Sequence, residues 1–299
     1  MEVKVGEGEK AYFAAGTRKI ETESSVLISS SKYLNNASLR ALIAQEMLRR
    51  NGPDLPNTAF IPDVVQILMG LEDYGRIMEL FEIEKARLPK FREWCDNRHL
   101  SDFSKAEVST SKPGTLGAAL YHWMDTTGYE LDLFYREIEV VNDLTFYLRQ
   151  AALNHDIEHL VSGFGPNHGG ELALVSANLH SRARYFHPEL SAFFSRVQAY
   201  LKAKTLMKDA LYYPEAFTLS LEAEFQGAIQ GRNWKYPIML ADWRAMVDWQ
   251  MADIRAEIGV TPVPPEDLWA DTNRLVDEGH ERFGQPFDGH ENWYMEAAE

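Results

Sequence analysis

Hydrophobic side chains along most of this chain recur at steps of three and four residues, the spacing of one face of an α-helix. The pattern predicts helices over residues 26–50, 61–86, 115–126, 131–138, 142–162, 171–185, 188–209, 215–230 and 237–258. No segment shows the strict alternation of a half-buried strand, and no segment repeats. We therefore expect an all-α protein.

Helix-breaking residues divide the chain into three parts. Residues 1–24 are polar and form an N-terminal lead-in, and residues 25–260 form a single large multi-helix domain. The proline-rich run 260–265 ends this domain, so residues 261–299 are an acidic C-terminal extension. Because aromatic side chains such as Trp269 are interspersed there, we expect part of the extension to pack on the domain or on a second subunit.

Composition narrows the classes of function. The 299 residues are 45% hydrophobic and carry a net charge of −15, which argues against nucleic acid as a partner. Cys95 is the single cysteine, so an internal disulfide and a multi-thiolate zinc site are excluded. No run approaches the roughly 18 apolar residues of a spanning helix, and no signal peptide is evident. A cytoplasmic protein is expected.

The stretch His155-Asp156-Ile157-Glu158-His159 carries the most informative chemistry. Residues four apart share a helix face, so His155 and His159 point the same way, with Asp156 able to reach the same place from one side. The histidines continue an apolar stripe made of Leu144, Leu148 and Ala151. Burying two imidazoles and a carboxylate together is costly unless a group such as a divalent cation satisfies them.

A glycine-rich turn over residues 163–170 brings the chain back, and Glu171 opens the next helix. We therefore predict a metal site made of four ligands: His155, Asp156, His159 and Glu171. Nitrogen and oxygen ligands without thiolates suit Zn²⁺, Fe²⁺ or Mn²⁺, and such a set can leave a coordination position open, as catalytic sites do.

Neighbouring polar residues have more than one interpretation. Glu158 either faces solvent or supports the ligands from behind. His168 is a further ligand, a substrate contact or an exposed loop residue, whereas His180 and His187 are expected to be structural. Thr115 can cap a helix whose small residues 117–119 allow a close approach of another backbone or a ligand. The aromatic and methionine side chains at 234–251 line an apolar channel or belong to the core.

The spacing resembles a known signature. An H-D-x-x-H motif at 155–159, eleven residues and then Glu171 resemble the coenzyme Q (ubiquinone) biosynthesis protein 4 family. Residues 113–117 resemble the proline-x-threonine/serine-leucine-glycine stretch of that family, and residues 243–260 resemble its closing helix. The resemblance covers roughly residues 59–260.

This resemblance implies an all-helical protein with His155, Asp156, His159 and Glu171 as ligands of Zn²⁺ or Fe²⁺. It also implies a groove for a polyprenyl tail and association with other ubiquinone biosynthesis proteins at the inner membrane face. The implied activity is C1 oxidative decarboxylation of a polyprenylated 4-hydroxybenzoate-type precursor.

Two other functions stay open. One is a non-catalytic prenyl-lipid scaffold, and a homodimer is compatible with either function. The other is a metal phosphohydrolase that uses the His155-Asp156 doublet, for which His122 and Asp209 are the available additional ligands.

Overall fold

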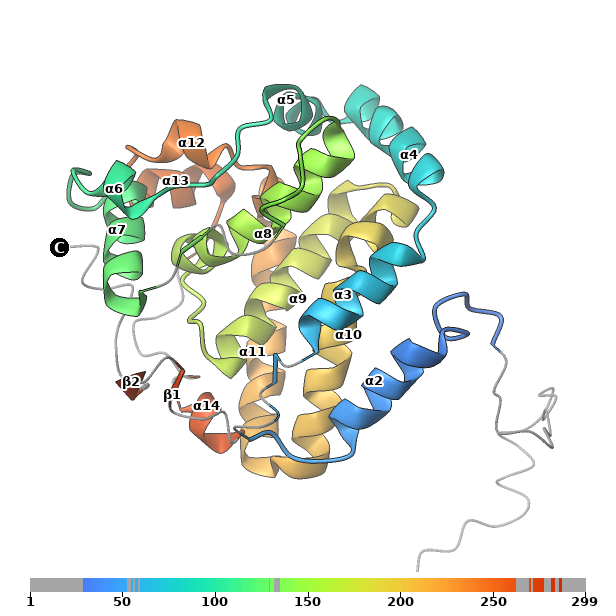
Figure 1. Cartoon of the computed structure of the whole chain (residues 1–299). Helices are drawn as coiled ribbons and strands as arrows, with labels where there is room; N and C mark the ends of the chain where they lie inside the picture. The colour runs from blue at the N-terminus through green and yellow to red at the C-terminus, as the bar shows by residue number, and fades with distance from the viewer. Residues whose placement is uncertain are drawn as a thin grey trace, which may run out of the picture.

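The structure is a computed structural model. It describes residues 29–52, 55, 57–58, 60–128, 130–131, 135–261, 269 and 271–276, and the backbone of 281–282 and 285–286. Within these residues the protein is all-α, as predicted, apart from one short hairpin (Figure 1). The elements are α2 (Ala37–Met47), α3 (Ile61–Gly70), α4 (Tyr74–Arg87), α5 (Pro89–Asn97), α6 (Lys105–Val108), α7 (Leu116–Thr127), α8 (Asp143–Ser162), α9 (His168–Tyr185), α10 (Pro188–Tyr212), α11 (Pro214–Asn233), η1 (Ile238–Leu240), α12 (Trp243–Met246), α13 (Met251–Ile258), α14 (Thr272–Leu275), β1 (Glu281–Arg282) and β2 (Gln285–Pro286).

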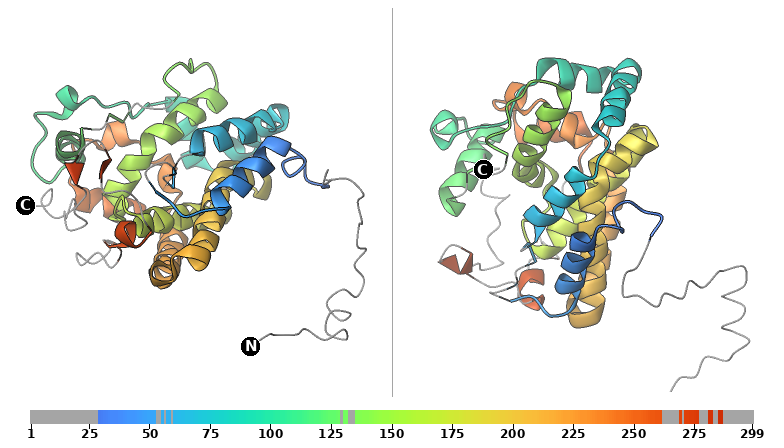
Figure 2. Two further views of the ribbon diagram at one scale, coloured as in Figure 1. Left: turned by 60° about the horizontal axis from the view of Figure 1, so that its bottom comes forward. Right: turned by 45° about the vertical axis from the view of Figure 1, so that its right-hand side comes forward.

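Helices α9, α10 and α11 pack side by side and form the centre of the molecule (Figures 1 and 2). Helices α2 and α3 pack on α10, while α8 contacts α7, α9 and α13 towards the other side. Helices α9 and α11 approach closely because two glycines of α11 face α9. A Cβ built on Gly231 would lie 1.9 Å from the carbonyl oxygen of Ala177. Any side chain at this position would push the two helices apart.

Local capping sets the ends of α8 and α9, the helices that carry the predicted ligands. The Asn142 side chain accepts a hydrogen bond from the Thr145 amide at 2.9 Å, and the Thr145 hydroxyl accepts one from the Asn142 amide at 3.0 Å. This reciprocal capping box starts α8. Gly163, with φ 79°, ends α8 in the left-handed conformation that glycine adopts without strain. Asn167 then caps α9 by accepting from the Gly170 amide at 2.8 Å.

Several predicted helix boundaries are wrong. The helix predicted over 61–86 is two helices, since residues 71–73 intervene and the Asp73 side chain caps α4. Helix α5 was not predicted, and α6 lies in the expected connection over 98–113. Of the stretch predicted at 26–50, the described residues are helical only over α2. Of that at 131–138, the described residues form no helix, and Tyr135 has φ 61°.

The segment predicted as one helix over 237–258 is divided into η1, α12 and α13. Its backbone instead pairs with the start of α7: the Leu116 amide donates to the Trp249 carbonyl at 3.1 Å, and the Met251 amide donates to the Gly114 carbonyl at 2.9 Å. Thr115 caps α7, as predicted, and the Gly117 amide donates to the Val247 carbonyl at 2.8 Å. The small residues of α7 therefore serve close packing.

Most of the aromatic and methionine side chains at 234–251 are buried in the hydrophobic core. Trp234, Met239, Trp243 and Met246 are buried in it, so these four pack the interior. The described part of the C-terminal extension contributes too, because Trp269 is 1% exposed and packs in the same cluster as Trp234, Trp243 and Met246. None of the described helices is long and apolar enough to cross a bilayer.

Candidate metal centre

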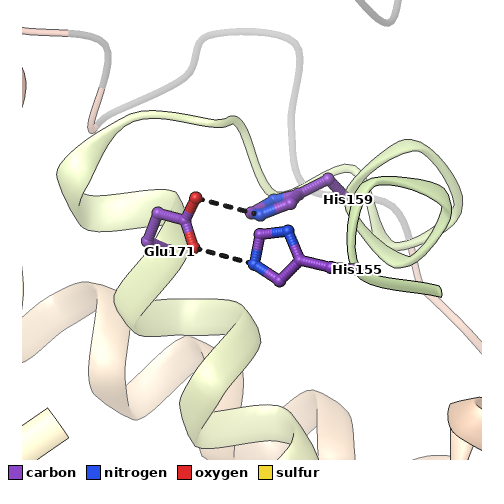
Figure 3. Close-up of side chains that lie close together, drawn as sticks. All are labelled: His155, His159 and Glu171. Carbon is purple, nitrogen blue, oxygen red and sulfur yellow. Dashed lines mark hydrogen bonds and ion pairs between the residues drawn. The ribbon is translucent and has the colours of Figure 1, made fainter. Parts of the chain in front are cut away.

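Three of the predicted ligands come together where α8 meets the first turn of α9. His155 and His159, one turn apart on α8, face Glu171 of α9 (Figure 3). One ligand atom from each residue lies within 4.8 Å of the others, and among the described residues this is the group of His, Cys, Asp or Glu side chains that could hold a metal ion. His155 Nε2 lies 3.2 Å from Glu171 Oε2, and His159 Nε2 lies 3.3 Å from Glu171 Oε1.

The second nitrogen of each imidazole is engaged elsewhere. His159 Nδ1 lies 2.8 Å from the Phe164 carbonyl oxygen, and His155 Nδ1 lies 3.0 Å from Asp156 Oδ1. A carbonyl oxygen only accepts hydrogen bonds, so His159 Nδ1 carries the proton and donates it. By the same reasoning His155 Nδ1 donates to the Asp156 carboxylate. In its neutral form each imidazole would therefore direct the lone pair of Nε2 towards Glu171.

This arrangement requires a positive charge. Two nitrogen lone pairs facing a carboxylate repel one another unless a proton or a cation lies among them. His159 Nε2 is buried and its approach to Glu171, although close enough for an ion pair, is not aligned as a hydrogen bond. A buried ring nitrogen without a hydrogen-bond partner has a lone pair that can coordinate a metal ion, so the donor set fits a divalent cation.

Electrostatics at the site follow from the same geometry. Burial lowers the pKa of His155, but the Glu171 charge and the hydrogen bond with Asp156 outweigh burial and raise this pKa well above its usual 6.5. Burial raises the pKa of Glu171, but the interactions of its carboxylate with His159 and His155 outweigh burial and hold this pKa well below 4.5. Without metal, a proton on His155 therefore supplies the positive charge, and a metal ion must displace it.

The three residues differ in how far their side chains are exposed to solvent. The His159 side chain is 5% exposed, whereas those of His155 and Glu171 are each 44% exposed. The open side of the site is therefore formed by His155 and Glu171. Asp156 lies outside the three-atom group and contacts His155 from the side. Its geometry is that of a carboxylate that orients a ligating histidine, and direct ligation by Asp156 stays a prediction.

Glu158 does not face solvent. It is 4% exposed, its carboxylate accepts a hydrogen bond from Asn178 Nδ2 at 2.7 Å, and burial raises its pKa. Glu158 and His155 line a cavity of about 30 Å³ together with Arg182, enough space for about two water molecules. The polar residues behind the site, Asn178 and Arg182, were not predicted because nothing in their local sequence distinguishes them from other helical positions.

His168 is not an exposed loop residue. It opens α9, its ring is 2% exposed, and its Nε2 lies 2.8 Å from Asp209 Oδ2. The same Asp209 oxygen accepts a hydrogen bond from the Ser220 hydroxyl at 2.6 Å. Asp209 is thus engaged with α9 and α11, and neither it nor His122 belongs to the three-residue group. The extra ligands that a phosphohydrolase site would need are not assembled there.

Comparison with known proteins identifies a solved structure with a similar fold. No protein-family model matches the chain, and no curated protein matches it. Among solved structures, the crystal structure of a candidate ubiquinone biosynthesis protein from Nostoc punctiforme is similar, with a TM-score of 0.55 and 23% sequence identity. The match covers 69% of this chain and 89% of the Nostoc chain. This likeness shows a shared helical architecture.

Proposed function

We propose that this chain is a metal-dependent ubiquinone biosynthesis protein that acts on a polyprenylated 4-hydroxybenzoate-type precursor. The observation that carries the proposal is the convergence of His155 Nε2, His159 Nε2 and the Glu171 carboxylate, with each Nδ1 already donating a hydrogen bond. Ligating histidines almost always have their other ring nitrogen engaged in this way. The fold shared with the Nostoc protein and the motif spacing support the pathway.

The donor set favours Zn²⁺ or Fe²⁺. Two imidazole nitrogens and a carboxylate oxygen suit these ions, and three protein ligands leave a position for substrate, as in catalytic sites. The metal would polarise and orient the ring carboxylate or phenolate as a Lewis acid, or take part in oxygen chemistry if it is iron. His155 and Glu171, which are half-exposed, form the side from which a substrate can approach.

The proposed reaction is C1 oxidative decarboxylation. The ring loses its carboxylate as CO₂ and gains a hydroxyl at the same carbon, a two-electron oxidation. With water as the source of the hydroxyl oxygen and O₂ as the oxidant that takes the two electrons, the remaining product is H₂O₂. Within the protein, Asp156 and the Phe164 carbonyl hold the imidazoles in orientation. We also propose that other proteins of the pathway are its partners, on the same grounds as the pathway itself.

Metal content tests the first part of the proposal. Protein purified without a polyhistidine tag and dialysed against Zn²⁺ or Fe²⁺ should retain about one ion per chain by elemental mass spectrometry. Variants His159→Ala and Glu171→Ala should retain much less. His122→Ala, a histidine of α7 outside the group, is the matched control and should retain as much as the unchanged protein. Equal retention by all four proteins would refute the site.

Quinone synthesis tests the second part. In a host that lacks this biosynthetic step, the unchanged chain should restore ubiquinone, measured by mass spectrometry of extracted lipid, while His155→Ala and Glu171→Ala should not. If these variants restore synthesis fully although they no longer bind metal, the metal is not catalytic and a prenyl-lipid scaffold becomes the better function. If the unchanged chain restores nothing, the pathway assignment fails.

A further inference from the structure

The described part of the C-terminal extension packs against the turn between α8 and α9, next to the candidate metal centre. Trp269 and residues 271–276, which include α14, contact the start of α9; we call them the C-terminal strap. The strap is also anchored at its other end, where Val276 is buried and its carbonyl accepts a hydrogen bond from Asn51 Nδ2 at 3.0 Å. It is therefore a fixed part of the fold.

The strap supplies hydrogen-bond acceptors to the first turn of α9. The first amides of any helix have no partner within the helix. Here the His168 amide donates to Asn273 Oδ1 at 2.7 Å, and the Gly169 amide donates to the Thr272 hydroxyl at 2.9 Å. Only the Gly170 amide is satisfied locally, by Asn167. Two of the three amides that precede Glu171 are thus held by side chains about a hundred residues further along the chain.

The strap also contacts the segment that orients His159. The centroids of the Trp269 and Phe164 rings lie 6.0 Å apart, and the Phe164 carbonyl is the group that accepts the hydrogen bond from His159 Nδ1. Trp269 packs so closely on α9 that a Cβ on Gly169 would lie 2.5 Å from the Trp269 Cβ. One segment therefore touches both the residue that orients His159 and the helix start that sets Glu171.

We infer that the C-terminal strap positions the candidate metal centre, with Thr272 and Asn273 as positioning residues that act through the first turn of α9. This inference rests on the proposed metal site. Ligand atoms must be placed to within a fraction of an ångström, and a helix start held at only one amide would let Glu171 shift relative to the histidines of α8. The strap is a second support for the site, remote in sequence.

The affinity for Zn²⁺ tests this inference. It is measured by competition with a chromophoric chelator, at a temperature where circular dichroism shows each protein to be folded. Thr272→Val keeps the shape but loses the hydroxyl, and we expect Zn²⁺ binding at least about 10-fold weaker, the usual size of such effects. Thr272→Ser keeps the hydroxyl and should restore the affinity. Arg274→Ala, on the same short helix and 61% exposed, is the matched control and should bind as the unchanged protein does.

The outcomes separate this inference from the proposed function. If Thr272→Val lowers the melting temperature but binds Zn²⁺ within twofold of the unchanged protein, the strap is only a stabilising element and the inference is wrong. Should Thr272→Val not fold, Asn273→Ala removes a single, less buried contact and is judged by the same criterion. If the unchanged protein itself binds no Zn²⁺ or Fe²⁺, the proposed function fails first.

Discussion

Replacing Gly231 of α11 by alanine should destabilise the protein, contrary to the usual effect of this change in a helix. Alanine in place of an interior helical glycine contributes about 1 kcal/mol through helix propensity. At Gly231, however, the new Cβ would lie 1.9 Å from the Ala177 carbonyl oxygen, where real contacts are at least about 3 Å. Helices α9 and α11 would have to separate by about 1 Å.

Overpacking of this kind costs about 1–3 kcal/mol. After subtraction of the propensity gain, we expect Gly231→Ala to lower the free energy of unfolding by up to about 2 kcal/mol, a fall of several degrees in melting temperature. Gly70, in α3, is the matched control, because a Cβ there has no heavy atom within 4 Å. Gly70→Ala should be neutral or stabilising, by up to about 1 kcal/mol.

The assay is urea denaturation of the metal-free proteins, followed by far-ultraviolet circular dichroism, with the melting temperature as a second measurement. The decisive quantity is the difference in sign between the two variants. If Gly231→Ala stabilises the protein as much as Gly70→Ala does, α9 and α11 do not approach as closely as described, and the reasoning fails.

Three further predictions concern pH, buried charge and capping. In the metal-free protein the Glu171–His155 pair should stabilise the fold fully between about pH 4.5 and 6.5. Because the pKa of Glu171 is lowered in the folded protein, this stabilisation is lost as the pH falls well below 4.5. Because the pKa of His155 is raised, it is also lost as the pH rises well above 6.5. Melting temperatures of the unchanged protein and His155→Ala across pH should differ most inside that window, and a constant difference would contradict the assignment. Lys204→Ala should cost about 3–5 kcal/mol of unfolding free energy, because it leaves the Glu46 carboxylate, which is 5% exposed, with the Tyr200 hydroxyl as a hydrogen-bond donor but without its cation. Arg76→Ala breaks an exposed pair and should leave the free energy of unfolding nearly unchanged in the same denaturation assay. Asn142→Ala removes one half of the capping box of α8 and should cost about 1 kcal/mol, and an unchanged denaturation midpoint would show that the box adds nothing.

Local sequence was enough to predict the arrangement of His155, His159 and Glu171. The histidines share a face because they are four apart on one helix, and the glycine turn after Ser162 returns the chain at once, so Glu171 in the first turn of α9 stays close to α8. Each of these relations spans fewer than twenty residues. Metal binding itself stays a prediction, since it depends on a cation as well as on the chain.

Features that depend on distant partners were not predictable in this way. The division of the segment at 237–258 results from backbone pairing with α7, more than a hundred residues earlier. His168 looked like a loop residue because its partner, Asp209, is 41 residues away. Helical periodicity in a single segment contains no information about either contact, which depends on how α7, α9 and α10 are placed in three dimensions.

The bonds between the start of α9 and the strap also have a consequence for the order of events during synthesis. His168 and Asn273 are 105 residues apart. At the usual rate of translation, about 5–20 s pass between the appearance of one and of the other. During that interval α8 and α9 can pair with the local cap at Asn167 alone. The helices that carry the histidines and Glu171 are therefore made early, whereas the last of the bonds that hold the start of α9 form only after the extension has left the ribosome.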